Sequence, residues 1–190
     1  MKLWMVRHPE PDVAPGICYG RTDLAPLPGP AAELIERLRR RLPRDAHLYS
    51  SPLQRCASVA LALPDHGFAA PRFDPRLAEM HFGHWEGRPW AELPREEIGA
   101  WRADIANYVP PGGESVGEVA RRTTAFIGEL AHAEGDDVVL ITHAGVIQIL
   151  MKALRGEPLA GFGMARLDYG SVSLLRRGPQ GFEVLVLNER

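Results

Sequence analysis

The feature that most constrains the fold is a set of short apolar runs that each stop at a basic or imidazole side chain. Residues 3–6 and 137–142 are apolar runs without helical spacing. Such runs are typical of strands that are buried on both faces of a parallel sheet. Arg7 and His8 follow the first run, and His143 follows the second. Because ligands bind beyond the carboxyl ends of parallel strands, these ends form a candidate anion site.

A third run, His47–Ser51, makes the same pattern. It leads through Pro52 into a helical segment that carries Arg55 near its first turn. One strand end with a basic residue is a weak signal. Three strand ends that deliver His, His and Arg to one rim favour a functional site over an ordinary polar strand end.

The remaining pattern predicts one mixed α/β domain over residues 1–190. Apolar periodicity indicates helices at 31–42, 53–63, 95–108, 116–130 and 146–154. Further short strands are expected at 72–74, 164–168, 171–176 and 182–187, the last three of them as a closing antiparallel edge. Residues 10–30 are rich in Pro and Gly and are expected to form an ordered loop.

Composition argues against several partners. The chain has 24 acidic and 22 basic residues and a net charge of -2, which indicates neither nucleic acid nor anionic membrane as the main partner. Arg37 and residues 39–41 are better explained as a solvated helix face. No run approaches the roughly 18 apolar residues of a membrane span, so we expect a cytoplasmic protein. The two cysteines, without a CxxC pair, indicate reduced thiols.

The stretch Gly16–Asp23 stands out within the first loop. Its glycines permit close backbone approach to a ligand, and Tyr19 and Arg21 can donate hydrogen bonds to an anion. The alternative is a plain turn-rich connection, and this stretch by itself does not decide between the two.

A second loop, at 77–87, crowds titratable groups around Glu79. His81 and His84 are three residues apart, which raises the question of a metal site. No third ligand lies nearby, so surface or substrate-lining histidines are favoured over metal ligands.

The chemistry follows from what the chain contains. It has no GxxxxGK phosphate loop and no GxGxxG motif, so nucleotide cofactors have no support and no cofactor is expected. Arginine matches phosphate oxygens bidentately, and a neutral imidazole can attack phosphorus to form a phosphohistidine. Such a reaction needs a proton donor for the leaving alkoxide, and Glu79 is the best-placed carboxylate.

Four separated motifs resemble the histidine phosphatase (phosphoglycerate mutase-like) superfamily. They are Arg7-His8, Ser51-Pro-Leu-Gln-Arg55-Cys-Ala57, Glu79-Met-His-Phe-Gly83-His-Trp-Glu86-Gly87 and Thr142-His143-Ala-Gly145. The resemblance covers almost the entire chain. It implies a three-layer α/β/α fold with a central, mostly parallel sheet and an antiparallel edge.

The resemblance also implies roles for the five chemical residues. His8 is the implied nucleophile, Arg7 and Arg55 the phosphate clamps, His143 the phosphoryl stabiliser and Glu79 the proton donor that later activates water. The expected substrate-binding residues are Cys18, Tyr19, Gly20, Arg21, His81 and Trp85. No metal ligand is expected.

Two stretches further resemble the α-ribazole phosphatase branch, which removes a 5'-phosphate in cobalamin assembly. These are Gly16–Asp23 and Pro111-Gly-Gly-Glu-Ser115. Two departures bear on phosphate binding, because Pro9 stands where the superfamily motif has Gly and Ala14 where many members have Asn. The expected partner is a phosphorylated small molecule, and a monomer and a homodimer remain open.

Three other functions are compatible with these residues. They are a broad-specificity phosphatase, a phosphoglycerate mutase and a non-catalytic phospholigand-binding module. The chain is shorter than typical mutases of the superfamily, which disfavours the second. The presence of all five chemical residues disfavours the third.

Overall fold

The computed structural model describes residues 1–130, 137–160 and 166–190. Within them, six strands form one sheet in the order β3-β2-β4-β1-β5-β6. The strands are β1 (Lys2–Arg7), β2 (His47–Ser50), β3 (Arg72–Phe73), β4 (Asp137–Thr142), β5 (Val172–Gly178) and β6 (Gly181–Glu189). Strands β1 to β4 are parallel, and β5 and β6 join antiparallel. The predicted mostly parallel sheet with an antiparallel edge is confirmed.

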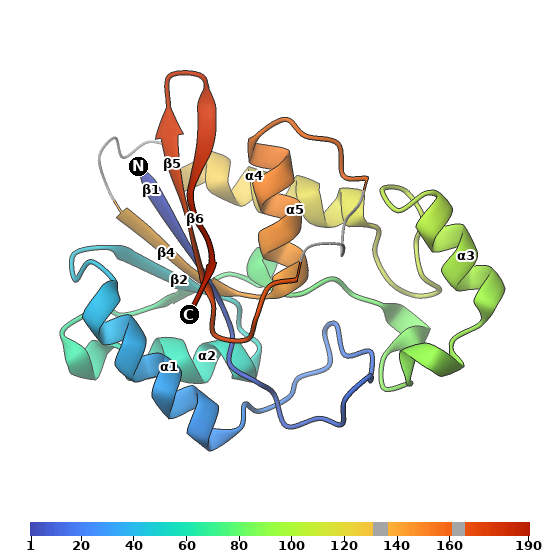
Figure 1. The fold of residues 1–190 in the computed structure, drawn as a ribbon, viewed down its shortest axis with the longest axis horizontal. Helices are drawn as coiled ribbons and strands as arrows, with labels where there is room; N and C mark the ends of the chain where they lie inside the picture. Colours follow the sequence, from blue (N-terminus) through green and yellow to red (C-terminus); the bar gives the residue numbers. More distant parts are fainter. Residues whose placement is uncertain (131–136, 161–165) are drawn as a thin grey trace.

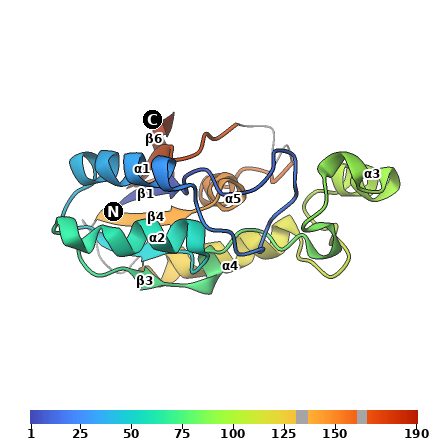
Figure 2. The same cartoon turned by 90° about the horizontal axis from the view of Figure 1, so that it is seen from below.

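Helices cover both faces of the sheet (Figure 1). One layer contains α1 (Pro28–Arg41) and α2 (Gln54–Ala62), and the other α4 (Val116–Leu130) and α5 (Ala144–Leu154). Helix α3 (Arg95–Ala103) stands apart from the sheet in both views (Figures 1 and 2). Single 3-10 turns are η1 (Pro64–His66), η2 (Pro75–Leu77), η3 (Gly83–Trp85) and η4 (Trp90–Glu92). No helix in the described ranges is long and apolar enough to cross a membrane.

The apolar runs of β1 and β4 reflect burial on two faces. Leu3 and Met5 pack in the core beneath α4 and α5, whereas Val6 packs in the core beneath α1 and α2. On β4 the same alternation separates Val138 and Leu140 from Val139 and Ile141. Because successive side chains of a strand point to opposite faces, an apolar residue at every position packs against both helical layers. This explains why apolar and polar residues do not alternate in these strands.

In the register of the sheet, the carboxyl ends of β1, β2 and β4 lie side by side. Arg7 pairs with Thr142, and Ser50 pairs with Ile141. The ladder continues one residue further, because the His8 amide donates to the Thr142 carbonyl at 2.9 Å. The residues that follow β1, β2 and β4 therefore emerge at one edge of the sheet.

Two helix boundaries differ by three or more residues from those expected. Helix α1 begins at Pro28, three residues before Ala31, because a proline suits the first helical turn. The helix expected to reach Tyr108 ends at Ala103, where Asp104 leaves helical geometry with φ -134° and ψ 65°.

The strand expected at 164–168 falls partly outside the described residues. Its described part, 166–168, has no strand and leads as a loop toward β5.

We expect Leu140→Ala to lower the free energy of unfolding by about 3 kcal/mol, because it leaves a cavity on a central strand. Leu140 is fully buried, whereas Leu61 on α2 is 60% exposed. Urea denaturation of both alanine variants measures the difference, and Leu61→Ala is expected to stay within about 0.5 kcal/mol of the parent. Similar losses in the two variants would contradict this packing of β4.

Candidate active site

His8 follows β1 and is buried, with 1% of its surface exposed. Its Nδ1 lies 2.7 Å from the carbonyl oxygen of Pro9. A carbonyl can only accept, so Nδ1 carries the proton and donates it. The other ring nitrogen, Nε2, is therefore left with a free lone pair.

His143 follows β4 and is the residue before α5. The Arg55 Nε donates to its Nδ1 at 3.2 Å, and a guanidinium has no acceptor. The His143 proton must therefore lie on Nε2, which is 2.8 Å from the Ser51 hydroxyl oxygen. The rings of His143 and His8 lie with centroids 5.1 Å apart.

Arg55 lies in the first turn of α2 and is fully buried. Its two terminal nitrogens donate to the carbonyl oxygens of Thr22 at 2.8 Å and Gly20 at 2.7 Å. Gly20 is required by close approach, because a Cβ there would lie 2.0 Å from the Met80 carbonyl oxygen. One guanidinium thus connects the imidazole of His143 with the loop around residue 20.

Both histidines are neutral at neutral pH. Burial is the main cause that lowers the pKa of His8 well below its usual value, and the positive charges of Arg55 and Arg7 lower it further. Burial likewise lowers the pKa of His143, with Arg55 as the next cause. The edge of the sheet therefore combines two fixed guanidinium charges with two uncharged imidazoles.

Arg7 is oriented by a tyrosine that the sequence did not single out. Its guanidinium lies over the Tyr169 ring at 3.8 Å, and NH1 donates to the Leu167 carbonyl oxygen. The Tyr169 hydroxyl is 2.8 Å from that of Tyr19, and its ring centroid lies 5.7 Å from that of His8. The buried Nε of Arg7 has no acceptor in the described part of the chain.

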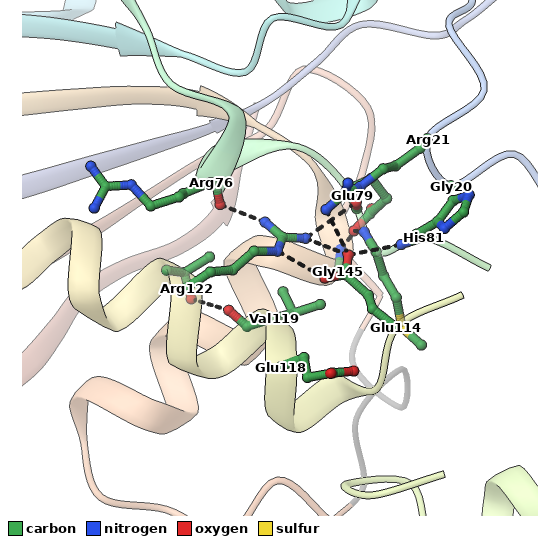
Figure 3. Close-up of polar contacts among 12 residues, drawn as sticks. Gly20, Arg21, Arg76, Glu79, His81, Glu114, Glu118, Val119, Arg122 and Gly145 are labelled. Atoms are coloured by element: carbon green, nitrogen blue, oxygen red, sulfur yellow. Dashed lines mark hydrogen bonds and ion pairs between the residues drawn. The ribbon is translucent and has the colours of Figure 1, made fainter. Parts of the chain in front are cut away.

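Glu79 is half-buried and reaches the amino end of α5 (Figure 3). Its Oε2 accepts from the Gly145 amide at 3.1 Å, and its Oε1 accepts from the Met80 amide at 3.0 Å. These two amide donors fix the direction in which the carboxyl group points. A Cβ on Gly145 would lie 2.4 Å from Glu79 Oε1, so only glycine permits this approach.

A cavity of about 160 Å³ opens next to part of this cluster, and its lining does not include Arg55 or His143. Arg7, His8 and Glu79 provide polar lining, and the apolar walls are Ile17, Tyr19, Phe82 and Trp90. The arrangement can hold an anion next to an imidazole nitrogen with a free lone pair, and it places a carboxylate near the same anion.

A protein-family comparison matches residues 3–190 to the histidine phosphatase superfamily, branch 1. The chain belongs to this superfamily. It is therefore a phosphatase, and the superfamily indicated by the four sequence motifs is confirmed.

Relatives of this histidine phosphatase carry two substrate names. An adenosylcobalamin/alpha-ribazole phosphatase of Salmonella typhimurium is 31% identical over 100% of this chain and 97% of its own length. A glucosyl-3-phosphoglycerate phosphatase of Mycolicibacterium vanbaalenii is 36% identical over 83% of this chain and 76% of its own. A mycobacterial glucosyl-3-phosphoglycerate phosphatase solved with VO3 is 29% identical, with a TM-score of 0.86 over 100% and 99% of the two chains.

The structure brings the five predicted chemical residues of the phosphatase together. Arg7 and His8 come from the end of β1, Arg55 from α2, Glu79 from the loop after η2 and His143 from the end of β4. Four separate segments of the chain thus meet at one edge of the sheet.

The six expected substrate-binding residues separate into three pairs. Tyr19 and Gly20 line the cavity, whereas Cys18 and Trp85 are buried in a cluster with Leu93. Burial raises the pKa of the Cys18 thiol to about 12, as expected for a thiol enclosed in an apolar cluster.

Arg21 and His81 lie at the surface and contact carboxylates. Arg21 pairs with Glu114 at 3.2 Å, and the His81 Nε2 lies 3.9 Å from Glu86. Among the described residues, no group of three or more His, Cys, Asp or Glu side chains is arranged to hold a metal ion.

Three residues at the site were missed by the sequence reasoning. Phe82 and Trp90 line the cavity, and Tyr169 contacts both Arg7 and His8. The density of aromatics near residue 85 was a signal for the first two. Tyr169 had no local signal, because its role depends on β5 lying beside β1.

The two lowered histidine pKa values predict a pH dependence of stability. Below the ordinary histidine value of about 6.5, the unfolded chain takes up protons that the folded chain does not. We therefore expect the free energy of unfolding to fall between about pH 7.5 and about pH 5.5, measured by urea denaturation. His8→Gln should reduce this dependence, and His84→Gln, at an exposed position, should leave it unchanged. The same slope in all three proteins would contradict the assignment.

Proposed function

We propose that the protein is a metal-independent phosphomonoesterase that forms a phosphohistidine on Nε2 of His8. The observation that carries the proposal is the hydrogen bond from His8 Nδ1 to the Pro9 carbonyl oxygen at 2.7 Å. It fixes the tautomer in which Nε2 can attack, and the lowered pKa of His8 keeps the ring uncharged. The proposal takes residues 1–190 as one catalytic domain, since both helical layers and the sheet contribute to the site.

The phosphoryl group would be held by charges already in place. Arg7 has a buried Nε without an acceptor in the described residues, and a phosphate oxygen would supply one. Arg55 supplies a second fixed positive charge beside His143. His143 lies close enough to His8 to contact a phosphoryl group on Nε2. Such preorganised charges stabilise the negative charge that develops during transfer.

The reaction then proceeds in two displacements. The Nε2 lone pair of His8 attacks phosphorus, the phosphorus–oxygen ester bond breaks, and the leaving oxygen takes its electron pair and a proton from Glu79. In the second step the Glu79 carboxylate takes a proton from water as the water oxygen attacks phosphorus. The nitrogen–phosphorus bond breaks, and inorganic phosphate and free His8 are released.

The walls of the cavity favour a substrate with a flat, apolar alcohol portion. Phe82 and Trp90 meet edge to face with ring centroids 5.2 Å apart, and Tyr19 lines the cavity beside them. Aromatic side chains bind planar rings by stacking. The volume of about 160 Å³ is small for an entire nucleotide. The phosphoryl group of the substrate would occupy the cavity, and the planar ring of its alcohol portion would stack against the partly exposed Trp90.

We therefore favour α-ribazole 5'-phosphate, a benzimidazole nucleotide, as the substrate class. The Salmonella relative, whose name includes this activity, matches over the full length of the chain. Glucosyl-3-phosphoglycerate is the second candidate, because it is named for a relative with 36% identity. Its leaving group carries a carboxylate and sugar hydroxyls, and the apolar walls formed by Ile17, Phe82 and Trp90 suit it less well.

His8→Ala is expected to abolish phosphate release while leaving the unfolding transition intact. The assay measures phosphate release from p-nitrophenyl phosphate in the presence of EDTA, which should not change the rate. His84→Ala, at an exposed position of η3, is the matched control and should retain full activity. Retained turnover in His8→Ala would exclude the covalent mechanism, and a loss with EDTA that zinc restores would reinstate a metal site.

Trp90→Ala is expected to lower kcat/KM for α-ribazole 5'-phosphate about tenfold, which corresponds to about 1.4 kcal/mol of lost stacking. Glycerol phosphate, which has no ring, should change less than about twofold. Phe73→Ala replaces an exposed aromatic residue on β3, outside the cavity lining, and is the control. A parent enzyme that prefers glucosyl-3-phosphoglycerate, or that hydrolyses all three esters equally, would overturn the substrate assignment and leave the phosphatase chemistry intact.

A further inference from the structure

We propose that Arg122, paired with Glu114, is a positioning residue that fixes the loop carrying the proton donor Glu79. The inference rests on the proposed function, since it takes Glu79 as the group that protonates the leaving oxygen. Neither residue lies in the catalytic cavity, and both act through the main chain of residues 79–81.

Arg122 extends from α4 toward the underside of this loop (Figure 3). Its Nε and NH2 donate to the two carboxylate oxygens of Glu114 at 3.1 and 2.8 Å, which is a bidentate pair. The same NH2 donates to the Glu79 carbonyl oxygen at 3.2 Å. NH1 donates to the Arg76 carbonyl oxygen. The guanidinium therefore holds the main chain at two points, one of them Glu79 itself.

Glu114 holds the other end of the same short segment. Its Oε1 accepts from the His81 amide at 2.9 Å. The Glu114 amide in turn donates to the His81 carbonyl oxygen at 2.9 Å. The segment from Glu79 to His81 is thus held at its first carbonyl by Arg122 and at its last residue by Glu114.

The ion pair between Arg122 and Glu114 is largely buried, so it can hold the loop in a defined position. The side chains of Arg122 and Glu114 are 15% and 14% exposed. The neighbouring Arg121 is 78% exposed and reaches Glu118 at 3.8 Å. Exposed pairs of the latter kind contribute little, whereas a bidentate and sheltered pair holds a defined geometry.

The position of the Glu79 side chain is critical, because its carboxyl group must contact the amino end of α5 and also reach the leaving oxygen of the substrate. The carboxylate contacts the Gly145 amide, so a shift of the Glu79 main chain would move it relative to His143 and the cavity. Arg122 is also close enough for its charge to lower the pKa of His143. A misplacement of about 1 Å can cost about 100-fold in rate.

The test compares substrates that differ in their need for a proton donor. R122M is expected to lower kcat/KM about 100-fold for an alkyl phosphate and at most about threefold for p-nitrophenyl phosphate, whose leaving group needs little protonation. R122K should recover part of the loss because it retains a donor. R121M, one residue away on α4, should leave both substrates unchanged. Urea denaturation establishes that each variant is folded, and E114Q replaces R122M if that variant does not fold.

A second readout separates positioning from general weakening of the structure. If Arg122 acts through Glu79, then R122M should cost nothing further in an E79Q background with the alkyl phosphate. Equal slowing of both substrates, no slowing in the folded variants, or a full additional loss in the E79Q background would each overturn the inference. A parent enzyme that releases no phosphate from either ester would instead reject the proposed phosphatase mechanism.

Discussion

The buried guanidinium of Arg55 is the interaction on which the site depends. A fully buried arginine stays charged, and burial of a charge is costly unless hydrogen bonds compensate. Its acceptors include the carbonyl oxygens of Gly20 and Thr22 and the Nδ1 of His143. These contacts fix the His143 tautomer. Burial is the main cause that lowers the pKa of both imidazoles and keeps them uncharged, and the charge of Arg55 lowers it further because another proton beside it is unfavourable. The centre is therefore cationic through its arginines, and in the proposed mechanism His8 is its nucleophile.

Two carboxylates join the loops that surround this centre. Glu86 accepts from the amides of Arg21 at 2.9 Å and Phe82 at 3.0 Å, so it links the loop near residue 20 to the loop of Glu79. Burial raises the pKa of Glu86, but hydrogen bonds led by that from the Thr22 hydroxyl lower it more, and the net pKa lies below its usual value. Glu114 makes the corresponding link from residues 79–81 to α4. An ionised carboxylate can accept several amides at once, which suits it to joining irregular segments.

Relatives that are similar to this chain over most of its length carry different substrate names, so similarity of fold does not decide the substrate. A TM-score of 0.86 relates this chain to a glucosyl-3-phosphoglycerate phosphatase, and full-length identity of 31% relates it to an alpha-ribazole phosphatase. We infer that the difference lies in the walls of the cavity beside His8. Here those walls come from Ile17, Tyr19, Phe82 and Trp90, on two loops that the sheet does not control.

The sequence by itself determined the buried strands β1, β2 and β4 and the basic and imidazole side chains that follow them, because apolar runs and strand ends are local signals. His8 and Arg55 could be placed at one edge from the parallel-sheet rule alone. The sequence could not show that Cys18, expected to bind the substrate, packs in an apolar cluster instead. Polarity and loop composition do not determine the direction in which a side chain points. Only the tertiary structure brought Tyr169 against Arg7 and Arg122 beneath Glu79. These contacts join residues more than 40 positions apart through irregular segments, and their geometry is set by the packing of α4 and β5, which has no local signature.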